Sequence, residues 1–126
     1  MTRQAAILID HGTTAPSAEE GLARLTAVLA GRAGMRVYPA HLNGKPSLAA
    51  AVAQAAADGA ERVIVLPCLL TVGHHLRDTL PALLEEARRA HPAVELRMAD
   101  PLGLDDRLAD ILLDRLRGHL AGRTTA

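Results

Sequence analysis

The chain has 126 residues and no net formal charge, with acidic and basic side chains mixed along its length. A chain of this length is expected to form one domain. It contains a single Tyr and no Phe or Trp. Without aromatic stacking residues or a basic block, it lacks the features of a nucleic-acid-binding surface.

Other whole-chain features narrow the class of protein further. No stretch reaches the roughly 20 apolar residues of a membrane span, and Asp10 and His11 interrupt the first apolar run too early for a signal peptide. Cys68 is the only cysteine, which excludes a disulfide within one chain and predicts a small core residue. We therefore expect a cytoplasmic protein that contacts neither membranes nor nucleic acid.

Apolar runs alternate with helical patterns along the whole chain. The tail from Gly122 is expected to fray, and residues 1–126 are expected to form a single domain. The expected elements, in chain order, are a strand at 5–10, a helix at 16–31, a strand at 35–40, a helix at 48–57, a strand at 62–67, a helix at about 76–90, a strand at 94–98 and a helix at about 104–120.

Four strand–helix pairs predict an α/β fold, a four-stranded parallel sheet with helices on both faces. Right-handed crossovers limit the topology, and a 2-1-3-4 strand order places the first and third strands side by side. Helices leave these two strands in opposite directions, which opens a crevice at their carboxyl ends. Polar residues that follow these strands are therefore candidates for a common site.

The first candidate is His11, which directly follows the first predicted strand. The turn continues with Gly12, which permits a tight backbone, and with Thr13 and Thr14, whose hydroxyls and amides can hold an anion at the start of a helix. A histidine that makes only a local hydrogen bond is the alternative. A polar cluster directly after a buried strand favours the functional interpretation.

The second candidate is the segment Gly73-His74-His75, which lies between the third strand and the third helix. Adjacent histidines cannot both face one point on a regular helix or strand, so only one of them is expected to act. For either residue alone, a solvated loop histidine is an equal alternative. Placement at the same sheet edge as His11 strengthens the functional interpretation.

His41 follows the second predicted strand, so it also reaches the carboxyl edge and is a candidate third ligand. Three imidazoles from separate strand ends can bind a divalent ion such as Co²⁺, Ni²⁺, Zn²⁺ or Fe²⁺, or they can act as general bases near neutral pH. A surface histidine is the alternative for His41. His91 and His119 are expected to be solvated.

No motif indicates a nucleotide. The segment Gly44-Lys45-Pro46-Ser47 resembles the end of a P-loop, but Pro39 stands where the upstream glycine is needed. No Gly-x-Gly-x-x-Gly follows a predicted strand, and Gly-x-Ser-x-Gly is absent. The residue before the first histidine is not the Arg of the Arg-His-Gly phosphatases, which disfavours that class of hydrolase.

Several motifs follow one another along nearly the whole chain. They are Ile7-Leu8-Ile9-Asp10-His11-Gly12-Thr13, then Pro46-Ser47-Leu48, then Gly59 with Val63-Ile64-Val65-Leu66-Pro67, then Leu69-Leu70 with Gly73-x-His75 and Pro81, and finally Pro101-Leu102-Gly103. In this order and spacing they resemble the small sirohydrochlorin chelatases of the CbiX/SirB type, which are class II tetrapyrrole chelatases.

This resemblance implies insertion of Co²⁺ or Fe²⁺, with Ni²⁺ as a further candidate, into the tetrapyrrole sirohydrochlorin without ATP, in cobalamin or siroheme biosynthesis. It implies that His11 and His75, rather than His74, bind the metal and accept the pyrrole protons. The short members resemble one half of longer, two-lobed chelatases, which implies a homodimer around the macrocycle. Substrate contacts are expected from Gly12, Thr13, Thr14, Asn43, Gly73, His74 and Arg77.

The chain differs from the family pattern at two positions. Members commonly carry a Glu in the segment that reads His41-Leu42-Asn43 here, and Asn43 does not supply that negative charge. The Asp usual in the second motif is Thr79, with Asp78 one residue earlier. Asn43 therefore points to an alternative function, a non-catalytic relative that binds a metal or a tetrapyrrole and passes it to a partner.

Overall fold

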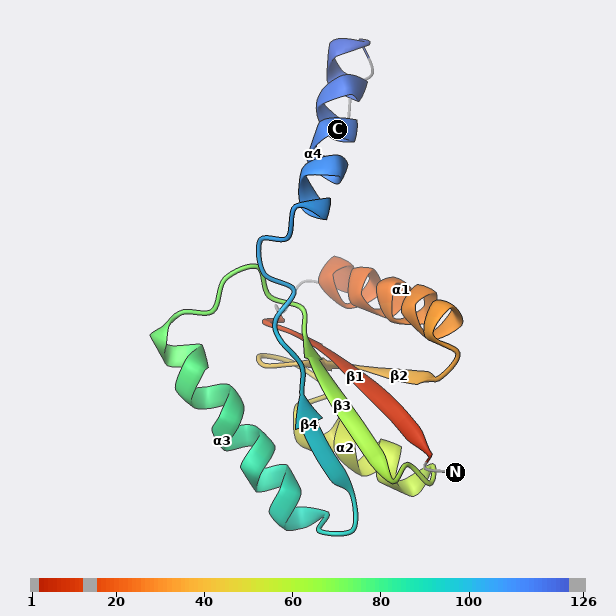
Figure 1. The fold of residues 1–126 in the computed structure, drawn as a ribbon, viewed down its shortest axis with the longest axis vertical. Coiled ribbons are helices and arrows are strands. Elements are labelled where there is room, and N and C mark those ends of the chain that lie inside the picture. The colour runs from red at the N-terminus through yellow and green to blue at the C-terminus, as the bar shows by residue number, and fades with distance from the viewer. Residues whose placement is uncertain (1–2, 13–15, 123–126) are drawn as a thin grey trace.

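The computed structural model describes residues 3–12 and 16–122, without the side chains of residues 16–18 and 75. The predictions for Thr13, Thr14 and the tail beyond Gly122 lie outside this part of the chain. Strands and helices alternate as predicted (Figure 1). The described elements are β1 (Gln4–Asp10), α1 (Pro16–Ala33), β2 (Arg36–His41), α2 (Leu48–Ala57), β3 (Arg62–Pro67), α3 (His74–Ala90), β4 (Glu95–Met98) and α4 (Arg107–Leu120).

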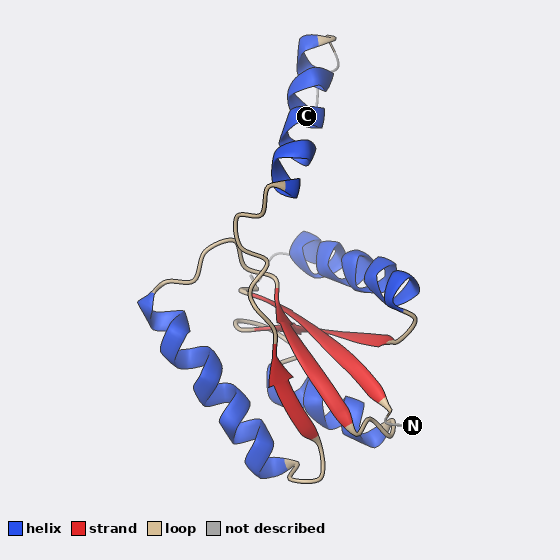
Figure 2. Ribbon diagram, viewed as in Figure 1, coloured by secondary structure: helices blue, strands red, loops and turns tan. Residues whose placement is uncertain are grey.

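The four strands form one parallel sheet in the order β2-β1-β3-β4, which confirms the predicted topology. Helices α2 and α3 lie on one face of this sheet and α1 lies on the other (Figure 1 and Figure 2). Strand β1 pairs with both β2 and β3, so Asp10 lies opposite His41 and Ile9 lies opposite Pro67. The carboxyl edge of the sheet therefore gathers the residues that follow all three strands.

The core lies between the sheet and the α2–α3 layer, and its buried residues are all Ala, Val, Ile or Leu. Ala51 and Ala55 are buried on α2, and their small size allows the helix to lie close to the strands. This packing matches the composition, which offers almost no aromatic bulk. The largest side chains without exposed surface are Ile7, Ile9, Val52, Val63 and Val65.

Local signals fix the ends of α2. The Ser47 side chain accepts a hydrogen bond from the Ala50 amide at 3.2 Å and caps the helix N-terminus. At the other end, the Gly59 backbone has a φ of 95°, a conformation that suits glycine and ends the helix before β3. These signals explain why the predicted and observed bounds of α2 coincide.

Helix α4 begins three residues later than predicted and lies apart from the rest of the molecule. The amides of Leu102 and Gly103 donate to the carbonyls of Pro67 and Leu69, which ties the segment before α4 to the segment that ends β3. No residue of α4 is buried, and the helix projects away from the sheet (Figure 1). Among the helices of the described residues, none has the length and apolar character needed to cross a membrane.

A cavity-forming substitution tests the α3 side of this core. Leu84 on α3 is only 4% exposed, so Leu84→Ala is expected to lower the free energy of unfolding by about 2–5 kcal/mol. Leu70→Ala, at an exposed position, is the control and should change it by less than about 0.5 kcal/mol. Urea titration followed by circular dichroism measures both values, and equal effects would contradict the packing.

Candidate functional site

The backbone pairing of β1 continues beyond the ends of the strands. The Leu42 amide donates to the Asp10 carbonyl at 2.9 Å, and the Asn43 amide donates to the His11 carbonyl at 2.8 Å. On the other side, the Cys68 amide donates to the Ile9 carbonyl at 2.6 Å. These bonds hold the segments after β1, β2 and β3 together at the carboxyl edge, where the topology predicts a site.

Gly12 is required by this close approach. Its φ is 79°, in the left-handed region that side chains disfavour. A Cβ atom at this position would overlap the Asn43 carbonyl oxygen and would lie 2.8 Å from the His41 Cβ atom. Glycine therefore allows the chain to leave β1 directly against the segment that follows β2, and this keeps His11 beside Asn43.

His11 is exposed, and its Nδ1 atom lies 3.2 Å from the Asn43 amide nitrogen. If that nitrogen donates, Nδ1 accepts and the neutral ring carries its proton on Nε2. If the amide rotates by half a turn, its oxygen accepts from Nδ1–H and leaves the Nε2 lone pair free for a metal. Asn43 can therefore pair with either neutral tautomer of His11.

His41 has a different environment from His11. It is only 4% exposed, and its Nδ1 atom lies 2.5 Å from a carboxylate oxygen of Asp10. Because Asp10 occupies Nδ1, a metal could reach this ring only through Nε2. Asp10 was not predicted as a site residue, although the pairing of β1 with β2 places it directly opposite His41.

Cys68 lies at the end of β3, close to the same carboxylate. The predicted core position is half-buried. Burial raises the pKa of the Cys68 thiol, and the negative charge of Asp10 raises it further. Near neutral pH the thiol is therefore protonated, which disfavours it as a nucleophile or a metal ligand.

The second predicted element opens α3. Gly73 has an extended backbone, and its carbonyl accepts from the Arg77 amide at 3.1 Å, so the helix begins at His74. The side chains of His74 and Arg77 are exposed. His75 is the second residue of α3, but its side chain lies outside the described part of the structure, so its convergence with His11 stays a prediction.

Two further features limit which ligands the described residues can hold. None of the described His, Cys, Asp and Glu side chains form a group of three arranged to hold a metal ion. A cavity of about 330 Å³ lies between α2 and α3 and reaches His41, Leu48, Leu83 and His91. This volume is at the lower end of the range for small-ligand pockets, so a larger ligand would have to lie across the exposed carboxyl edge.

The sequence is similar to a set of chelatases. The CbiX family model matches residues 5–119. The sirohydrochlorin cobaltochelatase of Sulfurisphaera tokodaii is 34% identical over 80 residues, covering 64% of this chain and 63% of that protein. The chloroplastic sirohydrochlorin ferrochelatase of Arabidopsis thaliana is 27% identical over 117 residues, covering 91% of this chain and 52% of that protein. The chain thus spans less than two thirds of these curated relatives.

Solved structures share the fold. A CbiX protein from Marinobacter aquaeolei VT8 superposes with a TM-score of 0.80 at 28% identity, covering 94% of this chain and 98% of the other. The sirohydrochlorin chelatase SirB from Bacillus subtilis subspecies spizizenii, in complex with cobalt, superposes with a TM-score of 0.84 at 19% identity. That match covers 92% of this chain and 50% of SirB, so this fold corresponds to half of the larger protein.

Two glycine substitutions test the turn after β1. Gly12→Ala is expected to destabilise the protein by more than about 1–2 kcal/mol, because left-handed strain adds to the overlap with the segment after β2. Gly31→Ala, inside α1 with nothing near the added methyl, is expected to stabilise it by about 0.5–1 kcal/mol. Thermal unfolding measures both changes, and a neutral Gly12→Ala would contradict the described turn.

Alkylation of Cys68 tests the electrostatic effect of Asp10 on its thiol. Iodoacetamide should modify the folded protein more slowly than the urea-unfolded chain at pH 8, since the raised pKa of Cys68 reduces the thiolate fraction. Asp10→Asn removes the negative charge, lowers this pKa and should raise the rate, by up to about the tenfold of one pKa unit. Asp100→Asn is the control. Equal rates for Asp10→Asn and wild type would argue against this electrostatic effect.

Proposed function

We propose, since the chain belongs to the CbiX family, that it inserts Co²⁺ or Fe²⁺ into sirohydrochlorin. The family match over residues 5–119 is the observation that carries this proposal. The names of the relatives support it, because both cobaltochelatases and a ferrochelatase of sirohydrochlorin are similar to this chain. The reaction belongs to cobalamin or siroheme biosynthesis.

The chemistry of the carboxyl edge suits this reaction. Metallation removes two pyrrole N–H protons from the macrocycle as the metal ion moves from protein ligands to ring nitrogens. Exposed imidazoles hold such a metal weakly and can accept the released protons near neutral pH. We assign these roles to His11 and His75, with His41 as a third ligand through Nε2. The macrocycle carboxylates would contact Arg77 and the amides at the start of α3.

The remaining parts of the proposal concern the assembly and its surroundings. We propose that the protein acts in the cytoplasm as a homodimer and needs no nucleotide. The described carboxyl edge is open, and the cavity beside His41 is too small to enclose a tetrapyrrole. A second copy would cover the opposite face of a flat macrocycle and exclude water from it.

A carrier that binds metal or tetrapyrrole without turnover is the second candidate. Asn43 favours it, because a neutral amide stands beside His11 where the family commonly has a carboxylate. A neutral neighbour attracts a divalent cation less strongly than a carboxylate does. Saturable Co²⁺ binding without metal insertion would support the carrier over the chelatase.

Metal insertion by purified variants tests the chelatase proposal. With Co²⁺ and sirohydrochlorin, His11→Ala and His75→Ala are each expected to reduce the insertion rate by about 10²–10⁴-fold, through loss of a ligand and proton acceptor. His119→Ala is the matched control and should keep the wild-type rate. The change in the macrocycle absorbance spectrum gives the rate.

Two outcomes separate the parts of this proposal. A wild-type rate equal to the uncatalysed rate, for both Co²⁺ and Fe²⁺, would exclude the enzyme. Full activity in both histidine variants would leave the enzyme and remove the assignment of His11 and His75.

A further inference from the structure

Three exposed leucines belong to two neighbouring segments at the carboxyl edge of the sheet. Leu70 follows β3 and is 51% exposed, while Leu102 and Leu104 follow β4 and are 48% and 74% exposed. A single exposed leucine is common on a protein surface, but several on adjoining segments indicate a surface that contacts an apolar partner. We call these three residues the leucine platform.

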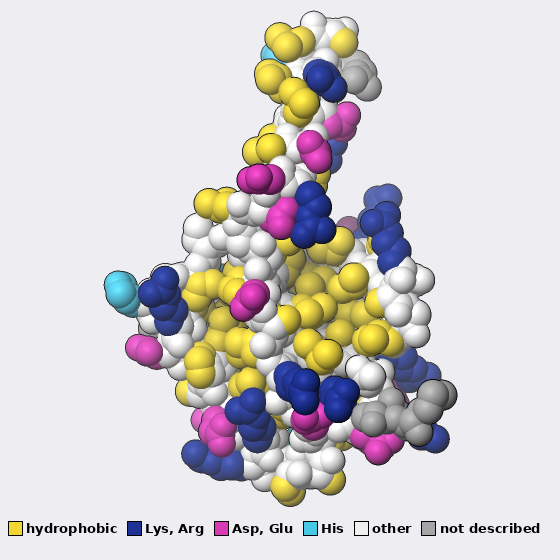
Figure 3. Space-filling model, in the orientation of Figure 1, with side chains coloured by type: hydrophobic (Ala, Val, Ile, Leu, Met, Phe, Trp, Pro, Cys, Tyr) yellow, Lys and Arg dark blue, Asp and Glu magenta, His cyan; other side chains and the backbone are white. Residues whose placement is uncertain are grey.

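Backbone hydrogen bonds join the two segments that carry the leucine platform. The Leu102 amide donates to the Pro67 carbonyl at 2.9 Å, and the Gly103 amide donates to the Leu69 carbonyl at 3.0 Å. The segment after β4 therefore runs beside the segment after β3 before α4 begins (Figure 1). Figure 3 shows exposed hydrophobic side chains where the chain leaves the sheet for α4, as well as over the face of the sheet.

The same backbone pairing places the leucine platform near His11. The Cys68 amide donates to the Ile9 carbonyl, so the segment after β3 lies between the segment after β1 and the segment after β4. Neighbouring strands of a sheet are about 4.8 Å apart. The leucines therefore belong to segments one and two strand spacings away from the segment of His11, a distance that a flat tetrapyrrole ring spans.

The chemistry of the leucine platform suits the face of a tetrapyrrole. The conjugated ring system is flat and its faces carry no charged group, whereas its carboxylates lie on the periphery. Ligand sites usually surround such a body with apolar side chains and use a few polar groups to set its orientation. An aromatic side chain cannot serve here, because Tyr38 is the only Tyr, Phe or Trp and its hydroxyl donates to Asp58 at the end of α2 that precedes β3.

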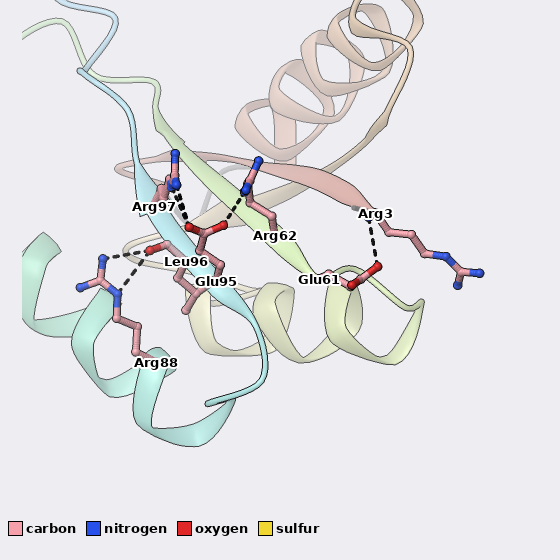
Figure 4. Close-up of polar contacts among 7 residues, drawn as sticks. All are labelled: Arg3, Glu61, Arg62, Arg88, Glu95, Leu96 and Arg97. Carbon is pink, nitrogen blue, oxygen red and sulfur yellow. Dashed lines mark hydrogen bonds and ion pairs between the residues drawn. The ribbon is translucent and has the colours of Figure 1, made fainter. Parts of the chain in front are cut away.

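The charged side chains around the sheet fit the same arrangement. Arg62 and Arg97 both bind the carboxylate of Glu95 within β3 and β4 (Figure 4), so these two guanidinium groups are already engaged. Arg77, at the start of α3, is exposed and forms no ion pair with another described residue. Its guanidinium group is therefore available to a carboxylate on the periphery of the macrocycle.

We propose that the leucine platform binds one face of the sirohydrochlorin ring and holds the ring beside His11. This inference rests on the proposed function and names the surface that receives its substrate. Burial of the leucines against the ring supplies the apolar contact, while Arg77 binds a peripheral carboxylate and sets the orientation. The leucine platform thus makes the site specific for a flat macrocycle over a smaller pyrrole that carries the same carboxylates.

Binding of metal-free sirohydrochlorin to the full chain tests the leucine platform. Leu70→Asn and Leu102→Asn are each expected to raise the dissociation constant about 5–20-fold, since a polar amide replaces apolar contact with the ring. Leu25→Asn on α1, where the leucine is 48% exposed, is the matched control and should keep the wild-type affinity. The change in macrocycle absorbance gives the dissociation constant, and far-UV circular dichroism checks that the variants are folded.

Two other readouts separate apolar contact with the ring from a purely structural role. Calorimetry gives the heat-capacity change of binding, which is negative when apolar surface is buried. This change should be less negative for Leu102→Asn than for the wild type and unaltered for Leu25→Asn. A monopyrrole with two carboxylates should bind the wild type at least about 10-fold more weakly than sirohydrochlorin, because it buries less apolar surface. Equal affinity for the two ligands would overturn the leucine platform.

Failure of the leucine platform is separable from failure of the proposed function. Unchanged affinity and heat capacity in both leucine variants overturn the leucine platform and leave the chelatase, which the metal-insertion rate of the wild type tests. Variants that lose self-association in sedimentation equilibrium but keep their affinity for the macrocycle also overturn it, since a second copy then covers the leucines. A wild type that binds sirohydrochlorin through the leucines without metal insertion overturns the chelatase alone, and a wild type that does not bind it overturns both.

Discussion

The pairing of β1 with both of its neighbours is the constraint on which the rest of this structure depends. As the central strand, β1 fixes the register of β2 and β3, and the core residues Ile7 and Ile9 lie in its middle. The same pairing continues past the strand ends into the segments that contain Asn43 and Cys68. Core and candidate site are therefore two parts of one hydrogen-bonded ladder, and a shift of register would disrupt both.

Much of this arrangement was predictable because the local signals agree with the global fold. The apolar runs, the Ser47 cap and the alternation of strands and helices predicted every element and the strand order. The contact between Asp10 and His41 was not predicted, because it depends on register across two strands, which periodicity does not give. The start of α4 was predicted three residues too early, because the Asp105 carboxylate accepts from the Arg107 amide and the helix begins only there, which apolar periodicity does not indicate.

The candidate site combines a buried histidine that contacts a carboxylate and an exposed histidine that contacts an amide. His41 is buried and held by a carboxylate, which fixes the orientation of its ring. His11 is exposed and contacts an amide, whose two ends can stabilise either neutral tautomer. A carboxylate in place of Asn43 could only accept a hydrogen bond, so it would favour the tautomer with the proton on Nδ1. The neutral amide therefore does not fix which ring nitrogen of His11 carries the proton.

The number of helices and the hydrogen bonds of the segment before α4 explain the position of this helix. Four strand–helix pairs provide four helices, of which α2 and α3 complete one face and α1 covers half of the other. The fourth helix packs on neither face, because the amides of Leu102 and Gly103 pair with the carbonyls of Pro67 and Leu69 and α4 begins beyond the carboxyl edge. The backbone pairing that organises the candidate site thus also leaves the sheet open.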